Sequence, residues 1–269
     1  MSVAHENATS TRLSRRLLAA GSALVVIAAA RFGIRPAPAS AKKKKKDPCK
    51  RPVAGANLDS CNLSMRNLAN ADLSGASMYA TFLSDDQGAG NPTSSFAAAN
   101  LSGVNGRCAI GVAGNFQAAN MASSSFINAN FSAANLREVV ATSSSWMGIT
   151  IARADLRDAD LTGVDLSGAI LNGANFTGAT FVSGKFYLTQ ASGVTFTDVN
   201  FTNAEITGSN FMGCEFTNAN FTGAIFSNAD LRQAALLGAT YSEQDLLAGS
   251  FLCNTVMSNG TVSNRDCTV

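Results

Sequence analysis

Histidine is almost missing from this chain of 269 residues, and the one copy is His5, close to the N-terminus. No CxxC pair and no glycine-rich loop leading into a helix occurs, and charged residues make up only 14% of the chain. The sequence therefore lacks the minimum sets for a Ser-His-Asp triad, a histidine zinc site or a phosphate cradle. These absences favour a protein that is not an enzyme and binds no cofactor.

What the sequence does contain is a period of five. From Phe96 to Phe251 a repeat centre, mostly Leu or Phe, stands at every fifth position, with no residue inserted or lost. The residue two positions before each centre is mostly small, and the residue directly before it is often Asn or Asp. Neither a helix nor a strand has this period, so the backbone must turn once in every repeat.

The period is explained if each repeat forms one side of a four-sided coil. The centre and the small residue then point inward, 20 residues close one turn, and identical sides stack at roughly 4.8 Å. Centres 20 residues apart should stack on one wall. One such column contains only Phe and Leu, as expected for an evenly filled interior: Phe96, Phe116, Leu136, Leu156, Phe176, Phe196, Phe216 and Leu236.

At Ala154-Asp155-Leu156, Ala174-Asn175-Phe176 and Ala219-Asn220-Phe221 the sequence resembles the A(D/N)LXX motif of the pentapeptide-repeat family. The resemblance implies an all-β solenoid, a right-handed quadrilateral β-helix. We expect it from residue 51 to residue 241, in about ten coils. Because the matched residues are those that build the coil, the resemblance is informative about the fold and not about the function.

Three features depart from the regular repeat. Gly106 and Gly111 occupy centres, so coil packing should be weakest there, and Trp146 should lean outward or use space beside Ala141. Thirteen residues separate the centres Leu83 and Phe96, which suggests two repeats and three extra residues. The segment 84–92 is rich in turn residues and predicts a loop. Its polar side chains are a candidate interaction site: Asp85, Asp86, Gln87 and Asn91.

Residues 1–41 are typical of a bacterial export signal. Arg15 and Arg16 precede an apolar run at 17–30, and Ala39-Ser40-Ala41 supplies an A-x-A cleavage site, with Ala39 and Ala41 as its small residues. The Arg pair resembles a twin-arginine motif, with a Sec signal as the alternative. We therefore expect a protein that is secreted or held in the cell envelope.

A basic segment follows, and residues 42–50 are predicted to be a disordered linker. The run Lys42–Lys46 is either a tether to an anionic surface or a spacer that exposes the cleavage site. The rest of the chain, residues 52–269, has eight Lys/Arg and sixteen Asp/Glu, a net charge of 8 − 16 = −8. A basic tail thus precedes an acidic body.

Residues 242–269 are expected to close the solenoid. Ser242 to Asp245 has capping-box spacing, which predicts a short helix at 242–248, with Leu246 and Phe251 still in register. Asn259-Gly260 predicts a two-residue hairpin, which brings Cys253 diagonally next to Cys267. Cys49 and Cys61 bracket the first coil, so these two pairs are candidate disulfides in an exported chain. Cys214 should replace an inward alanine.

Two hypotheses for function come from different classes. The first is a non-enzymatic, rod-like scaffold of the cell envelope that binds an unidentified protein or polymer, with a homodimer as a further option. The second is a DNA mimic that acts on gyrase, as some members of the family do. Mimicry needs a dense acidic face. The outward column Asn105, Ser125, Ser145, Asp165, Lys185, Glu205, Ile225 and Asp245 is sparsely acidic and contains a lysine, so no nucleic-acid role is expected.

Overall fold

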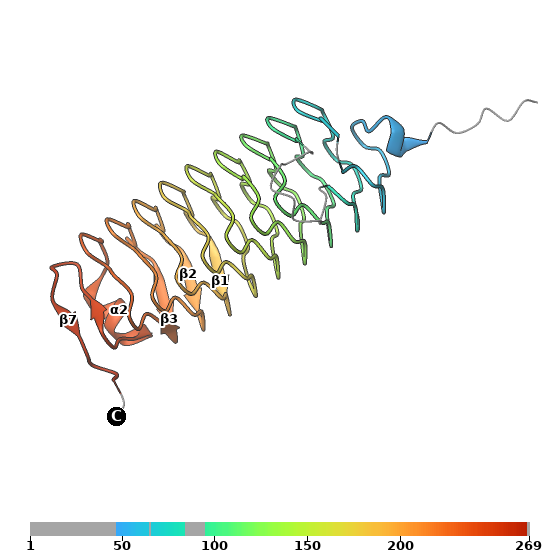
Figure 1. The fold of residues 1–269 in the computed structure, drawn as a ribbon. Helices are drawn as coiled ribbons and strands as arrows, with labels where there is room; N and C mark the ends of the chain where they lie inside the picture. The colour runs from blue at the N-terminus through green and yellow to red at the C-terminus, as the bar shows by residue number, and fades with distance from the viewer. Residues whose placement is uncertain (1–46, 65, 84–94, 268–269) are drawn as a thin grey trace, which may run out of the picture. The chain divides into compact units, whose positions relative to one another are not determined.

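Parallel β-bridges between residues 20 positions apart organise the chain (Figure 1). The computed structural model describes residues 47–64, 66–83 and 95–267. Asn100 bridges to Asn120, which bridges to Val140, and the other three sides of each coil repeat this pattern. At each level the N–H of a centre donates to the next coil, as Phe176 does to the carbonyl of Thr195 at 2.8 Å. The expected four-sided β-helix is therefore present.

A tight turn ends every side of the coil. The N–H of Ala119 donates to the carbonyl of Phe116 at 3.0 Å, and Ala118 between them has φ 54°. Positive φ at the third residue is the mark of a type II turn, which explains why glycine is frequent two positions after a centre. Because each side is so short, most sides have one bridge residue and no longer strand.

Extended strands occur where the bridges lengthen. β1 (Lys185–Tyr187), β2 (Glu205–Thr207) and β3 (Ile225–Ser227) form a parallel sheet in the order β1-β2-β3. β4 (Ala229–Asp230) pairs in parallel with β5 (Ser250–Phe251), and β6 (Thr255–Val256) pairs with β7 (Val262–Ser263) in antiparallel. The helical elements of the described residues are the 3-10 helix η1 (Pro48–Lys50) and the α-helix α2 (Glu243–Gly249). Within the described residues no helix is long and apolar enough to cross a membrane.

The predicted Phe/Leu column is buried throughout and stacks on one wall. The ring centroids of Phe176 and Phe196 are 5.2 Å apart, and those of Phe196 and Phe216 are 5.1 Å apart, with interplanar angles of 12° and 2°. Full burial of such a side chain contributes about 1.5–3 kcal/mol, and each aromatic pair adds about 0.5–1.5 kcal/mol. The interior column thus contributes substantially to the stability of the fold.

The prediction of weak packing at Gly106 and Gly111 is wrong. A Cβ added to Gly106 would lie 2.2 Å from Cε1 of Phe126, and one added to Gly111 would lie 2.4 Å from Phe131. The rings of the next coil therefore occupy the space above each glycine. Of the two alternatives for Trp146, burial excludes the outward one, because the side chain is fully buried; its indole N–H has no hydrogen-bond partner among the described residues.

The insertion before Phe96 is longer than the predicted three residues. Asn67 bridges to Ser95, a separation of 28 residues where most coils have 20, so eight residues are inserted (28 − 20 = 8). At the N-terminal end, residues 48–50 form η1 although the sequence predicted a disordered linker there. Val53, near the start of the expected solenoid, is 58% exposed.

The C-terminal segment also shifts the register. Asp230 pairs with Phe251, a separation of 21, so Phe251 faces outward with 48% exposure and Leu252 is buried in the position predicted for Phe251. In the hairpin Thr255 pairs with Ser263 and Val256 with Val262, and the N–H of Met257 donates to the carbonyl of Thr261, so three residues, 258–260, form the loop. The two-residue turn that the sequence predicted is therefore wrong, and the strand pairing is shifted by one residue from the predicted one.

Candidate interaction wall

The outward residues on the side of the coil that contains β1 form what we call the β1 wall. The bridges continue this side to Ser77 and Asn57, and we use the name for the seven levels with the centres Gly106, Phe126, Trp146, Leu166, Phe186, Ile206 and Phe226. The first row precedes the centres and consists of Asn105, Ser125, Ser145, Asp165, Lys185, Glu205 and Ile225. The second row follows the centres and consists of Arg107, Ile127, Met147, Ser167, Tyr187, Thr207 and Ser227. The corner row comes next and consists of Cys108, Asn128, Gly148, Gly168, Leu188, Gly208 and Asn228.

Bridges fix these rows as a lattice. Ser145 bridges to Asp165 and Asp165 to Lys185, and the sheet continues the row because Lys185 pairs with Glu205 and Glu205 with Ile225. Neighbouring levels lie about 4.8 Å apart, and alternate residues along one strand about 7 Å apart. The first row contains the residues of the outward column that the sequence predicted, up to Ile225.

Exposed apolar side chains lie on several levels of the β1 wall. Tyr187 is 54% exposed, Leu188 52% and Ile225 61%, and Met147 on a nearby level is also exposed. No large apolar side chain described between residues 57 and 250 is more exposed than these three. Because burial of such groups stabilises a complex, the presence of several of them on one wall marks a candidate contact surface.

The first row also has an alternating charge. Lys185 stands between Asp165 on the coil before it and Glu205 on the coil after it. Within the described residues it has no carboxylate within 4.0 Å, since the ion pairs there are Arg157–Asp155, Arg232–Asp230 and Arg265–Asp266. Its ammonium group is therefore available to a binding partner.

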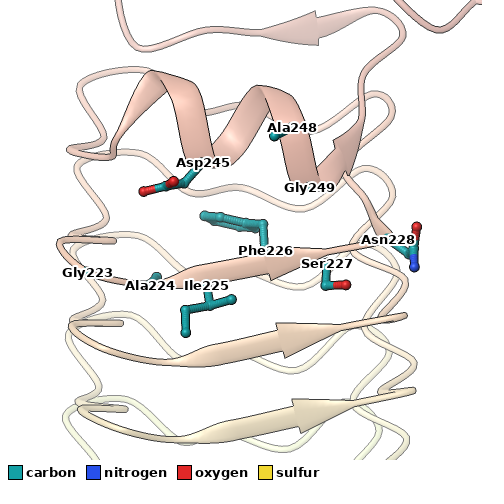
Figure 2. Close-up of a pocket in the computed structure, with 9 residues that line it drawn as sticks. All are labelled: Gly223, Ala224, Ile225, Phe226, Ser227, Asn228, Asp245, Ala248 and Gly249. Carbon is teal, nitrogen blue, oxygen red and sulfur yellow. The ribbon is translucent and has the colours of Figure 1, made fainter.

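A shallow pocket of about 330 Å³ lies where this wall meets α2. Figure 2 shows α2 crossing above β3, with Phe226 between them and Ile225 on the far side of β3 from the helix. The side chain of Ser242 accepts the N–H of Asp245, and Leu246 is buried. A Cβ on Gly249 would lie 1.9 Å from the carbonyl oxygen of Phe226, so glycine is required for this close approach. The helix thus covers the exposed edge of β3.

The cysteines are placed as the spacing suggested. Cys49 and Cys61 form a disulfide with a Cα–Cα distance of 5.5 Å, and Cys253 and Cys267 form another with 4.8 Å. Cys214 is buried, and its thiol donates to the carbonyl of Ala191. Burial raises the pKa of the Cys214 thiol to about 12. Cys108 is half-buried in the corner row of the β1 wall.

Several predicted site residues lie outside the described part of the chain. These are the loop residues Asp85, Asp86, Gln87 and Asn91, the signal residues Arg15, Arg16, Ala39 and Ala41, and the basic run Lys42–Lys46. The sequence reasoning did not identify the apolar cluster of the β1 wall. A usable signal was present, because Met147, Tyr187, Leu188 and Ile225 occupy outward positions where this repeat mostly has polar or small residues.

The family model for pentapeptide repeats matches eight copies, in residues 115–143, 151–186, 188–217 and 195–233. No curated protein sequence matches the chain.

Three similar solved structures are pentapeptide-repeat or resistance proteins. HetL, involved in heterocyst differentiation regulation in the cyanobacterium Nostoc, is 23% identical, with 79% of this chain and 94% of HetL covered and a TM-score of 0.36. QnrB1, a plasmid-mediated fluoroquinolone resistance protein, is 17% identical, with 74% and 92% covered and a TM-score of 0.35. A protein of the Arabidopsis thaliana thylakoid lumen is 27% identical, with 45% and 66% covered and a TM-score of 0.24.

Proposed function

We propose that this chain, whose repeats match the family model for pentapeptide repeats, is a non-enzymatic binding scaffold of the cell envelope that uses the β1 wall as its contact surface. The observation that carries the proposal is that Tyr187 and Leu188 on one coil, and Ile225 two coils further on, are each more than half exposed on this wall. Beside them, Lys185 supplies a charged group with no carboxylate close by within the described residues. A rigid lattice that presents both kinds of contact suits binding.

The carboxylates support binding over acid-base chemistry. A general acid that works near neutral pH needs a raised pKa. Arg157 holds the pKa of Asp155 below its ordinary value, and Arg232 does the same to Asp230. Both carboxylates are therefore ionised at neutral pH and serve as turn and ion-pair elements on other walls, where each also accepts the backbone N–H of its arginine.

Export is part of the proposal and is supported by the sequence. Arg15 and Arg16, the apolar run at 17–30 and Ala39-Ser40-Ala41 form a signal in the expected order. The two disulfides at the ends of the coil stack suit an oxidising compartment outside the cytoplasm.

Site-specific cross-linking in intact cells tests the wall. A photo-reactive amino acid replaces Tyr187, and in a matched control it replaces Thr202, which follows its centre in the same coil on another wall. We expect an adduct at 187 and none at 202. Equal adducts at both positions, or none at 187, would contradict the proposal.

Localisation and the gyrase hypothesis need separate measurements. Cell fractionation with N-terminal sequencing should find the chain outside the cytoplasm, starting near Lys42. A full-length cytoplasmic chain that inhibits DNA supercoiling by gyrase would instead support the DNA-mimic hypothesis.

A further inference from the structure

We infer that the β1 wall binds a second copy of this chain, wall against wall, with the two solenoids antiparallel. The inference rests on the proposed function, because it names the partner of the surface proposed there. It is argued from the order of charges and of side-chain sizes along the wall. In a two-fold interface residue i of one copy faces residue j of the other while j faces i, so a surface that pairs with itself must have complementary groups on the two sides of the axis.

The charged residues of the first row determine where the two-fold axis of the dimer lies. A two-fold axis parallel to the strands, halfway between the levels of Asp165 and Lys185, sets Asp165 opposite Lys185 of the second copy. The symmetry makes this contact twice. Moving away from the axis, Glu205 faces the hydroxyl of Ser145 of the second copy, so no like charges meet in the first row.

The sizes of the side chains agree with the same axis. In the second row Tyr187 faces Ser167 of the second copy, and Met147 faces Thr207. In the first row Ile225 faces Ser125, and in the corner row Leu188 faces Gly168. Each exposed large apolar side chain therefore faces a small residue, which is the pattern that lets two flat walls approach closely.

The neighbouring register is less favourable. An axis halfway between Lys185 and Glu205 would also pair opposite charges. It would, however, place the carboxylate of Asp165 against Ile225 of the second copy, which removes water from a charge without giving it a partner. The register with the axis between Asp165 and Lys185 is therefore the one we propose.

The size of the contact sets the expected strength. The axis lies near the middle of the solenoid, so eight levels from Asn105 to α2 overlap, a length of roughly 38 Å. A strip of this length and one wall wide is smaller than a standard interface of about 800 Å² per copy. We expect a dimer that dissociates in the micromolar range.

Charge reversal tests the pairing. In sedimentation velocity on the protein purified from the envelope fraction, Lys185→Asp alone and Asp165→Lys alone should each weaken dimerisation at least about tenfold. The double variant should restore it. Asp160→Lys, on the neighbouring wall of the same coil, is the matched control and should leave dimerisation unchanged. Dimerisation that is insensitive to both single reversals would overturn the inference.

Distances between spin labels test the register. Asn128 and Asn228 lie at corners of the wall, and Cys108 shows that the corner accepts cysteine, with φ 56°. In a Cys108→Ser background, labels at Asn128→Cys or Asn228→Cys should each give about 26 Å, from five coil steps and a separation of about 10 Å between sheets. A longer distance at 128 and a shorter one at 228 would indicate the other register and contradict the proposal.

The outcomes distinguish this inference from the proposed function. A protein that is monomeric at all concentrations but cross-links at position 187 to a different protein refutes the inference and supports a binding scaffold. A monomer with no cross-link at 187 refutes both. A dimer with the predicted charge rescue and an adduct of twice the chain mass supports both.

Discussion

Adding one methyl group at Gly106 should destabilise the coil stack, although the position has no side chain. The Cβ of Gly106→Ala would lie 2.2 Å from Cε1 and 2.4 Å from Cδ1 of Phe126. The ring of Phe126 cannot swing away freely, because it is fully buried and packs edge-on against Phe131 with centroids 5.2 Å apart. Overpacking of this kind costs about 1–3 kcal/mol.

A double-mutant cycle isolates this contact. Phe126→Leu removes the ring and should cost about 1–1.5 kcal/mol by itself, whereas Gly106→Ala in that background should be neutral or stabilising because the methyl group fills vacated space. The resulting coupling energy should be about 1–3 kcal/mol. Gly193→Ala is the control, since a Cβ there meets nothing within 4 Å and should show no coupling to Phe126.

The assay is guanidinium unfolding followed by the fluorescence of Trp146, the single tryptophan. Trp146 occupies the column of Phe126 one coil further on, so it reports on the region that the cycle perturbs. If Gly106→Ala raises the unfolding midpoint in the otherwise unchanged protein, the interior above the glycine is empty and the reasoning is refuted.

Three further predictions concern the ends, the ion pairs and the thiols. Cys267→Ser opens a disulfide that spans 14 residues and should remove about 3 kcal/mol of local stability. Hydrogen exchange should become faster in β6 and β7 and stay unchanged in the coils of the Phe/Leu column. Unaltered exchange in β6 and β7 would argue against a stabilising role of the disulfide. Because Arg157 lowers the pKa of Asp155, the ionised carboxylate stabilises the fold above about pH 4, and this stability is lost as the pH falls further. Asp155→Asn should therefore make the unfolding free energy less dependent on pH in acid. An acid denaturation curve identical to that of the unchanged protein would count against the ion pair. Iodoacetamide should label Cys108 in the folded protein and leave Cys214 unlabelled until unfolding; early labelling of Cys214 would be inconsistent with its burial.

The coil interior could be predicted from the sequence because the five-residue period identifies the residues that face inward. Phe176, Phe196 and Phe216 stack as the 20-residue column required. The packing at Gly106 could not be predicted, because it depends on how the ring of Phe126 tilts toward the neighbouring coil. The eight-residue insertion was also missed, since a segment without the repeat leaves no apolar position to count.

The register shift at the C-terminus has a physical reason that counting repeats of five residues does not take into account. A helix rises about 1.5 Å per residue and a strand about 3.3 Å, so a side of the coil built from α2 needs more residues than an ordinary side to span the same distance. The coil containing α2 accordingly takes 21 residues from Asp230 to Phe251. Counting in fives assigns Phe251 to the interior, whereas the structure buries Leu252 there.

The charge row of the β1 wall shows how one observation can support opposite conclusions. In the sequence, Lys185 interrupts a sparse acidic column and so weakens the case for mimicry of DNA. In the structure, the same lysine alternates with Asp165 and Glu205 on consecutive levels. A uniformly acidic row would repel its own copy and could face only a basic partner. A row of alternating sign becomes complementary to itself after a two-fold rotation, provided that the axis falls between opposite charges. The lysine that counts against one binding partner is therefore the residue that makes a second copy of the chain a suitable one.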